Sequence, residues 1–269
     1  MSRNRYMVPY LALIGARLRL ETQYRAAAIF GMCTQIFWGL VRVAIFTAFY
    51  KAGTAHLSMT LAQTVTYLWL VQAFIRIMPW NVDPEIRAMV HQGTVVYELL
   101  RPVDLFWAWY IRALAGHSIP TAMRSAPIFL VASLFLGLQL PYSIVTGFEW
   151  FIALILAILL AAAITTLLNV SLLFTIVGDG IQRVVPAISN FASGMLIPLT
   201  FLPLPLQSFI DFLPFRDLID TPVRIYLGLT TETQTLFLYI HALIWIALLI
   251  FTGRSLMRIA VSRFEVQGG

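Results

Sequence analysis

Long apolar stretches, separated by short polar segments, follow one another along the whole chain. A helix needs roughly 20 mostly apolar residues to cross about 30 Å of hydrocarbon. Six stretches meet this requirement, and they are residues 26–50, 60–80, 105–140, 150–177, 184–202 and 235–256. The pattern therefore predicts an all-α integral membrane protein, in which six transmembrane helices form a single domain over residues 1–269.

Three parts of this pattern are irregular. The stretch 105–140 is longer than a bilayer requires, which predicts an interfacial first part. The stretch 184–202 contains two prolines and is the least regular of the six. Before the first stretch, apolar residues recur at helical spacing between Met7 and Leu18 with polar residues opposite, which predicts an N-terminal helix in the membrane interface. A cytosolic extension of the first span is the alternative interpretation.

Composition supports a membrane protein. Only 11% of residues are charged and 60% are hydrophobic, whereas about a quarter are charged in soluble domains. Of the 18 Lys and Arg residues, thirteen fall in segments on the same side of the membrane as the N terminus, and only Lys51, Arg216 and Arg224 fall on the opposite side. The other two, Arg42 and Arg76, lie within apolar stretches. Because Lys and Arg are retained in the cytoplasm during insertion, both termini are expected to be cytoplasmic. The net charge of +6 is then explained by this bias and by attraction to membrane lipid, without a nucleic acid.

The longest polar break is residues 81–104, between the second and third stretches. Pro84 suits the first turn of a short helix, with Asp83 as its cap and Gly93 at its end. Such a helix, with Asp83, Glu85 and Arg87 exposed, has the form of a docking element. A solvated loop fits the same pattern.

Two sequence motifs carry a family resemblance. The run VHQGTVVYELLRPVD (residues 90–104) resembles a stretch of ABC-2 type exporter permeases, in particular the class that often works as unlike pairs. The run LPFRDLIDTPVRIYLG (residues 213–228) is similar to another motif of that family, before its last span. Their order and spacing extend the resemblance over nearly the whole chain.

This resemblance implies a half-transporter in the bacterial inner (cytoplasmic) membrane. Two six-span permeases, identical or paralogous, would pair above two copies of a separate ATPase, which would hold the ATP and Mg²⁺. A cytosolic coupling helix would follow the second span at residues 83–91. The side chains that it assigns to ATPase coupling are Asp83, Glu85, Arg87, His91, Glu98 and Arg101.

The resemblance also implies a pair of short re-entrant outer helices between spans five and six, at residues 203–232. The charged residues expected at the outer mouth are Asp211, Arg216, Asp217, Asp220 and Arg224. Pairing among these side chains and contact with departing substrate are both open.

Arginine and uncharged polar side chains within the apolar stretches form a second group of candidates. A centrally placed Arg such as Arg42 costs at least about 2.5 kcal/mol on insertion scales, so its face is expected to turn toward a partner or a cavity. The candidates for the translocation path are Gln35, Arg42, Gln72, Arg76, His117 and Arg124. Structural pairing, substrate contact and, for the last two, an interfacial helix face are all consistent with the pattern.

The sequence offers little for enzyme chemistry. The four His residues are scattered, and no HExxH, GxSxG or GxxxxGK[ST] motif is present, so no catalytic, cofactor or metal site is predicted. The favoured hypothesis is a permease subunit of an ATP-driven exporter, which moves a hydrophobic or amphipathic substrate by alternating access. An ATP-independent carrier or channel, and a membrane enzyme or assembly factor, are the alternatives.

Overall fold

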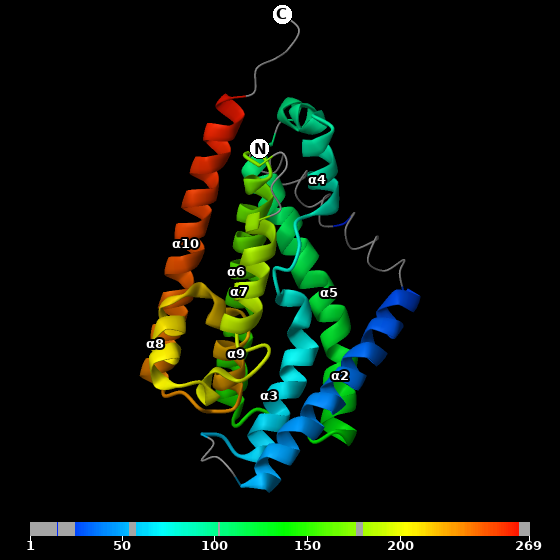
Figure 1. Ribbon diagram of the computed structural model, residues 1–269, viewed down its shortest axis with the longest axis vertical. Helices are drawn as coiled ribbons and strands as arrows, with labels where there is room; N and C mark the ends of the chain where they lie inside the picture. Colours follow the sequence, from blue (N-terminus) through cyan, green and yellow to red (C-terminus); the bar gives the residue numbers. More distant parts are fainter. Residues whose placement is uncertain (1–14, 16–24, 54–57, 102, 176–179, 264–269) are drawn as a thin grey trace, which may run out of the picture.

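A computed structural model describes residues 15, 25–53, 58–101, 103–175 and 180–263, and these residues contain helices and no strand. The long helices run side by side as a bundle (Figure 1). In chain order the elements are α2 (Arg25–Ala52), α3 (Leu61–Phe74), η1 (Ile75–Ile77), α4 (Pro84–His91), η2 (Thr94–Leu100), α5 (Leu105–Phe135), α6 (Ile144–Ser171), α7 (Gly180–Ala192), η3 (Leu199–Phe201), α8 (Leu204–Phe212), η4 (Pro214–Leu218), α9 (Asp220–Tyr226) and α10 (Glu232–Ser262). The all-α prediction is confirmed for this part of the chain. The predicted interfacial helix between Met7 and Leu18 lies outside the described residues.

Four helices are long and apolar enough to cross a membrane. They are α2 from Phe30 to Ala52, α5, α6 and α10. Two predicted spans contain shorter helices, because α3 has 14 residues and α7 has 13. The helix of the second stretch tightens into η1 and becomes extended at Met78, directly before Pro79, where a helical conformation is disfavoured. The six-span count therefore stays a prediction.

The central helix of the bundle is α6. It packs against α10, α5 and α9, and 56% of its most apolar segment is buried, against 6% for α2. Small side chains at Ala157 and Ala161 to Ala163 allow the neighbouring helices to approach closely. The outlying position of α2 leaves large apolar side chains such as Phe37 and Phe49 exposed.

Short helices fill the segment between α7 and α10, at the end of the bundle opposite α4 (Figure 1). α9 packs against α6, and η4 contacts both α6 and α10. Residues Asp220 to Val223 are buried there. The segment thus packs against the bundle, while the pair of re-entrant helices expected for residues 203–232 stays a prediction.

Candidate functional site

The short helix α4 occupies the polar break, as predicted. The Asp83 side chain accepts hydrogen bonds from the backbone N–H groups of Glu85 (2.9 Å) and Ile86 (3.3 Å), and Pro84 fills the first helical position. Gly93 follows the helix with a φ of 69°, which glycine adopts at little cost. The predicted cap, start and end of this helix are confirmed.

Asp83 also binds Arg112 of α5. Arg112 Nε lies 2.5 Å from Asp83 Oδ2, its Nη2 lies 2.9 Å from Oδ1, and the same guanidinium pairs with Glu85. The Asp83 side chain is only 15% exposed and that of Arg112 17%, whereas that of Glu85 is 62% exposed. The expectation that Asp83 projects into solvent is therefore wrong, because a partly buried bidentate ion pair turns it toward α5.

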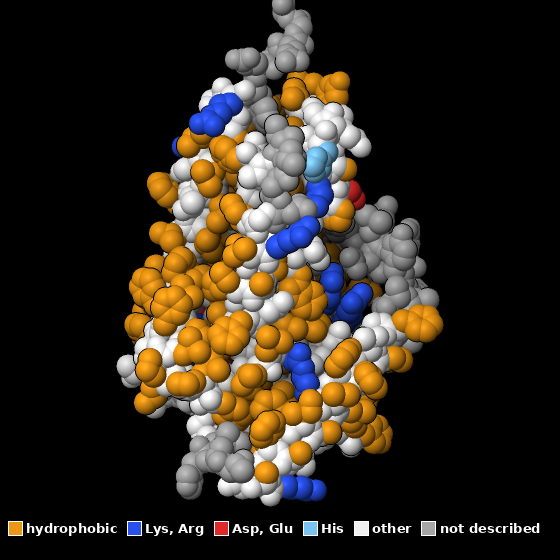
Figure 2. All heavy atoms as spheres, viewed as in Figure 1, with side chains coloured by type: hydrophobic (Ala, Val, Ile, Leu, Met, Phe, Trp, Pro, Cys, Tyr) orange, Lys and Arg blue, Asp and Glu red, His pale blue; other side chains and the backbone are white. Residues whose placement is uncertain are grey.

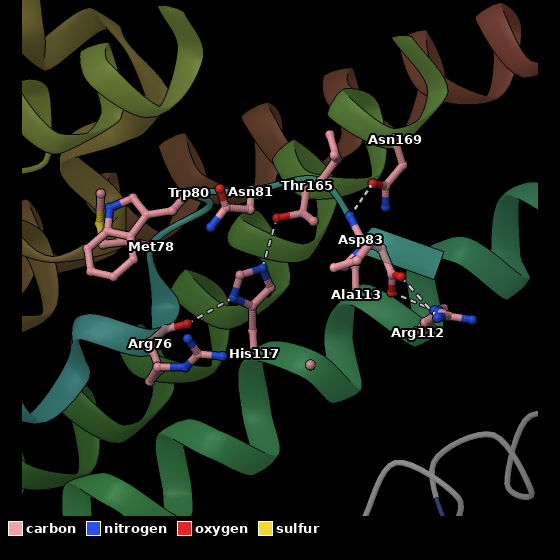
Figure 3. A pocket seen from close by; sticks show the side chains of 13 residues that line it. Arg76, Met78, Trp80, Asn81, Asp83, Arg112, Ala113, His117, Thr165 and Asn169 are labelled. Carbon is pink, nitrogen blue, oxygen red and sulfur yellow. Dashed lines mark hydrogen bonds and ion pairs between the residues drawn. The ribbon is translucent and has the colours of Figure 1, made fainter. Parts of the chain in front are cut away.

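Two further contacts join α4 to the bundle. The backbone N–H of Asp83 donates to Asn169 Oδ1 of α6 at 2.9 Å (Figure 3), and Arg87 donates to Gln182 of α7. The Ile86 side chain is fully buried beneath α4. Polar contacts from one eight-residue helix thus reach α5, α6 and α7.

A polar pocket of about 340 Å³ lies beside these contacts. His117 lines this pocket and links two elements: its Nδ1 lies 3.0 Å from the Arg76 carbonyl oxygen and its Nε2 lies 2.8 Å from Thr165 Oγ1 of α6 (Figure 3). Arg112 and Asp83 line the same pocket. The structure thus brings together Arg76 and His117, which were path candidates, with the ion pair under α4.

The remaining path candidates lie elsewhere. Arg42 of α2 donates to the Met195 carbonyl oxygen at 2.7 Å, so its face turns inward as expected. Gln35 is half-buried on the same helix, and Arg124 of α5 approaches α2. Gln72 is buried within α3, and its amide forms no hydrogen bond with the described residues.

The expected outer-mouth residues cluster around η4 and α9. Arg216 pairs with Asp211 and lies 4.0 Å from Asp217, while Arg224 lies 3.9 Å from Asp220. These five charges pair with one another, and a pocket of about 410 Å³ is lined by three of them.

Three partners of the predicted site residues could not be identified from the sequence. His241 Nδ1 lies 2.6 Å from Asp217 Oδ2, and Tyr67 donates to Asp220 Oδ1 at 3.0 Å. The third is Arg112, the partner of Asp83. Asp83 and Glu85 at the start of α4 form an acidic pair, which is a local signal that a cation lies nearby. This signal does not indicate which Lys or Arg supplies the cation.

Part of the α4–η2 region stays exposed. His91 and Gln92 at the end of α4, together with Tyr97, Leu100 and Arg101 around η2, form an exposed surface that we call the tip. Glu98 pairs with Arg101 at 3.1 Å at its edge. The tip combines exposed apolar area with polar groups at one end of the bundle, which is typical of a surface that contacts another protein or a membrane.

A family model described as ABC-2 family transporter protein matches residues 40–268 of the chain. No curated protein and no solved structure matches the chain.

Proposed function

The chain belongs to the ABC-2 family of transporter proteins, and from this we propose that it is the permease subunit of an ATP-driven exporter. The family supplies the transmembrane subunit of an ABC system and generally works with a separate ABC ATPase. In this proposal two permeases, identical or paralogous, pair in a bacterial inner membrane with both termini cytoplasmic. Two ATPase copies hold ATP and Mg²⁺, and the substrate is hydrophobic or amphipathic.

The observation that carries the proposal is the set of contacts around α4. Asp83, Glu85 and Arg87 contact α5 and α7 of the same chain, so we assign them to transmission of movement rather than to the first contact with the ATPase. We assign the first contact to the tip, where His91 and Tyr97 are exposed. A displacement of the tip would then move the attached helices as rigid bodies, a form of alternating access.

Two classes of variant test this division. Tagged permease is purified from its native membrane in mild detergent, and copurified ATPase is identified by mass spectrometry and assayed for ATP hydrolysis. A triple tip variant, His91→Ala with Tyr97→Ser and Leu100→Ser, is expected to lose the ATPase. Arg112→Gln is expected to keep the ATPase. It is expected to lose the ATP-dependent conformational changes of the permease, which are measured by limited proteolysis with and without ATP.

The matched control for the tip is Arg258→Ala with Ile259→Ser, which alters an exposed cation and an exposed apolar residue near the end of α10. It is expected to retain the ATPase. If the parent protein brings down no ATPase under conditions that preserve other membrane complexes, the exporter proposal fails and an ATP-independent carrier or channel replaces it. If the control loses the ATPase as the tip variant does, the assignment of docking to the tip is refuted.

A further inference from the structure

Arg42 lies in the middle of α2, the least buried of the four long apolar helices in the described part of the chain. The apolar part of α2 runs from Phe30 to Ala52, and Arg42 precedes Ala52 by ten residues, or about 15 Å along the helix. A guanidinium carries five N–H donors. In the described part of the chain, Arg42 makes one hydrogen bond, from Nη1 to the Met195 carbonyl oxygen, and no carboxylate lies within 4.0 Å of it. The charge of Arg42 is therefore only partly compensated.

Arg124 of α5 presents a second cation to the same face of α2. A Cβ added at Gly31 would lie 3.4 Å from Arg124 Nη1, so the guanidinium packs directly on the α2 backbone there. Gly31 and Arg42 are eleven residues apart, which is close to three full turns and about 16 Å. Both positions thus share one face of α2. Arg124 is half-buried, and among the described residues it has no ion pair.

The described helices α2, α3, α5 and α7 offer no anion to this pair, and Asp220, which packs against Gly194 next to Met195, is engaged with Tyr67 and Arg224. Neither Asp nor Glu occurs in α2, α3, α5 or α7. An identical second permease would bring the same helices and hence no carboxylate from them. Figure 2 shows Lys and Arg side chains extending into the largely apolar part of this face, with Asp and Glu scarce beside them.

Large apolar side chains lie on the same face of α2 as these cations. Trp38 and Phe49 are four and seven residues from Arg42, which places them on its side of the helix, and each is more than half exposed. A ligand that met both features would carry an anionic headgroup for the arginines and a hydrocarbon part for the aromatic surface. Arg recognises carboxylate and phosphate oxygens well, because its planar fork can donate two parallel hydrogen bonds.

We propose that the α2 seam, defined as Gly31, Gln35, Arg42, Arg124 and Met195, binds the acidic headgroup of an amphiphile. The exported substrate class is then an anionic amphiphile rather than any hydrophobic molecule. This inference rests on the proposed exporter function. Under that function, the headgroup would contact Arg124 first and Arg42 nearer the outer side.

The test uses dioleoyl phosphatidylglycerol as an anionic probe and dioleoyl phosphatidylcholine as a neutral one with the same chains. Each is added to the purified permease, with whatever ATPase copurifies, and bound lipid is counted by native mass spectrometry. The parent is expected to prefer the anionic lipid by about tenfold or more, because a hydrogen bond to a charged group contributes on the order of one power of ten in affinity. An Arg42→Gln, Arg124→Gln double variant is expected to lose this preference.

Lys51→Gln is the matched control, since it removes one cation from the exposed last turn of α2 and is expected to keep the preference. If the double variant is not monodisperse, the single variants Arg42→Gln and Arg124→Gln serve instead, and each is expected to weaken the preference. Equal binding of the two lipids by the parent, or an unchanged preference in a folded double variant, would overturn the proposal. Displacement of bound phosphatidylglycerol by an excess of glycerol 3-phosphate would overturn it too, because the seam would then bind a free anion.

The outcomes separate this inference from the function on which it rests. If an ATPase copurifies but neither lipid is preferred, the exporter proposal stands and the anionic substrate class is wrong. If the anionic lipid is preferred but no ATPase is found, the headgroup site stands and the exporter proposal fails.

Discussion

Arg112→Met tests whether α4 is held to the bundle by the partly buried ion pair between Arg112 and Asp83. The substitution removes the guanidinium and keeps most of the apolar stem. Breaking a buried pair costs about 3–5 kcal/mol when the remaining charge is uncompensated. Here the pair is only partly buried, and Asp83 keeps two backbone N–H donors at 2.9 and 3.3 Å, so we expect a smaller cost, about 2–3 kcal/mol. The Glu85 contact adds less than about 1 kcal/mol, because that side chain is 62% exposed.

This cost can be measured as local opening of α4. Because 1.4 kcal/mol corresponds to a factor of ten, backbone amides of residues 87–92 should exchange with deuterium about 30- to 140-fold faster in Arg112→Met than in the parent. Arg101→Met is the matched control. Its pair with Glu98 is 61% exposed on the Arg side and contributes less than about 1 kcal/mol, so the acceleration should stay below about fivefold. Equal exchange in the two variants would refute the conclusion that Arg112 holds α4.

Two further predictions concern packing inside the bundle, and both are measured as thermal unfolding of the protein in detergent. A Cβ at Gly39 would lie 2.7 Å from an atom of the Trp69 ring, so Gly39→Val should destabilise the contact of α2 with α3 by about 1–3 kcal/mol. Gly31→Ala is the control and should be tolerated, because the nearest atom to a Cβ there is a flexible guanidinium nitrogen at 3.4 Å. Equal midpoints for these two variants would contradict the close approach at Gly39. Tyr67→Phe removes a buried hydroxyl that lies 3.0 Å from Asp220 Oδ1 and should cost about 1–3 kcal/mol, and an unchanged midpoint would show that this hydrogen bond contributes nothing.

Local features of the fold were predictable where the signal is itself local. The cap of α4 depends on Asp83 and Pro84, which are adjacent, and its end depends on Gly93. The partner of Asp83 was not predictable, because Arg112 follows it by 29 residues and contact depends on how α5 packs. The contact between Tyr67 and Asp220 spans 153 residues and was missed for the same reason.

Hydropathy predicted which segments are apolar but not how each is used. It assigned α2 and α6 to the same class, although α6 is central and α2 largely exposed. It also extended the second and fifth predicted spans past the ends of α3 and α7, because a sum over side chains does not register backbone conformation. Gly194, with a φ of 80°, and the extended residue before Pro79 lie beyond those helix ends.

The most direct test of the exporter proposal is site-specific photo-crosslinking in intact native membranes. A photoreactive residue replaces His91 in the exposed tip, and Lys51, at the last turn of α2, carries the same residue as a control. The account predicts a crosslink from position 91 to a protein that contains a GxxxxGK[ST] phosphate-binding loop, and none from position 51 to that protein. Crosslinks from position 91 to lipid alone, or to the same proteins as position 51, would contradict it.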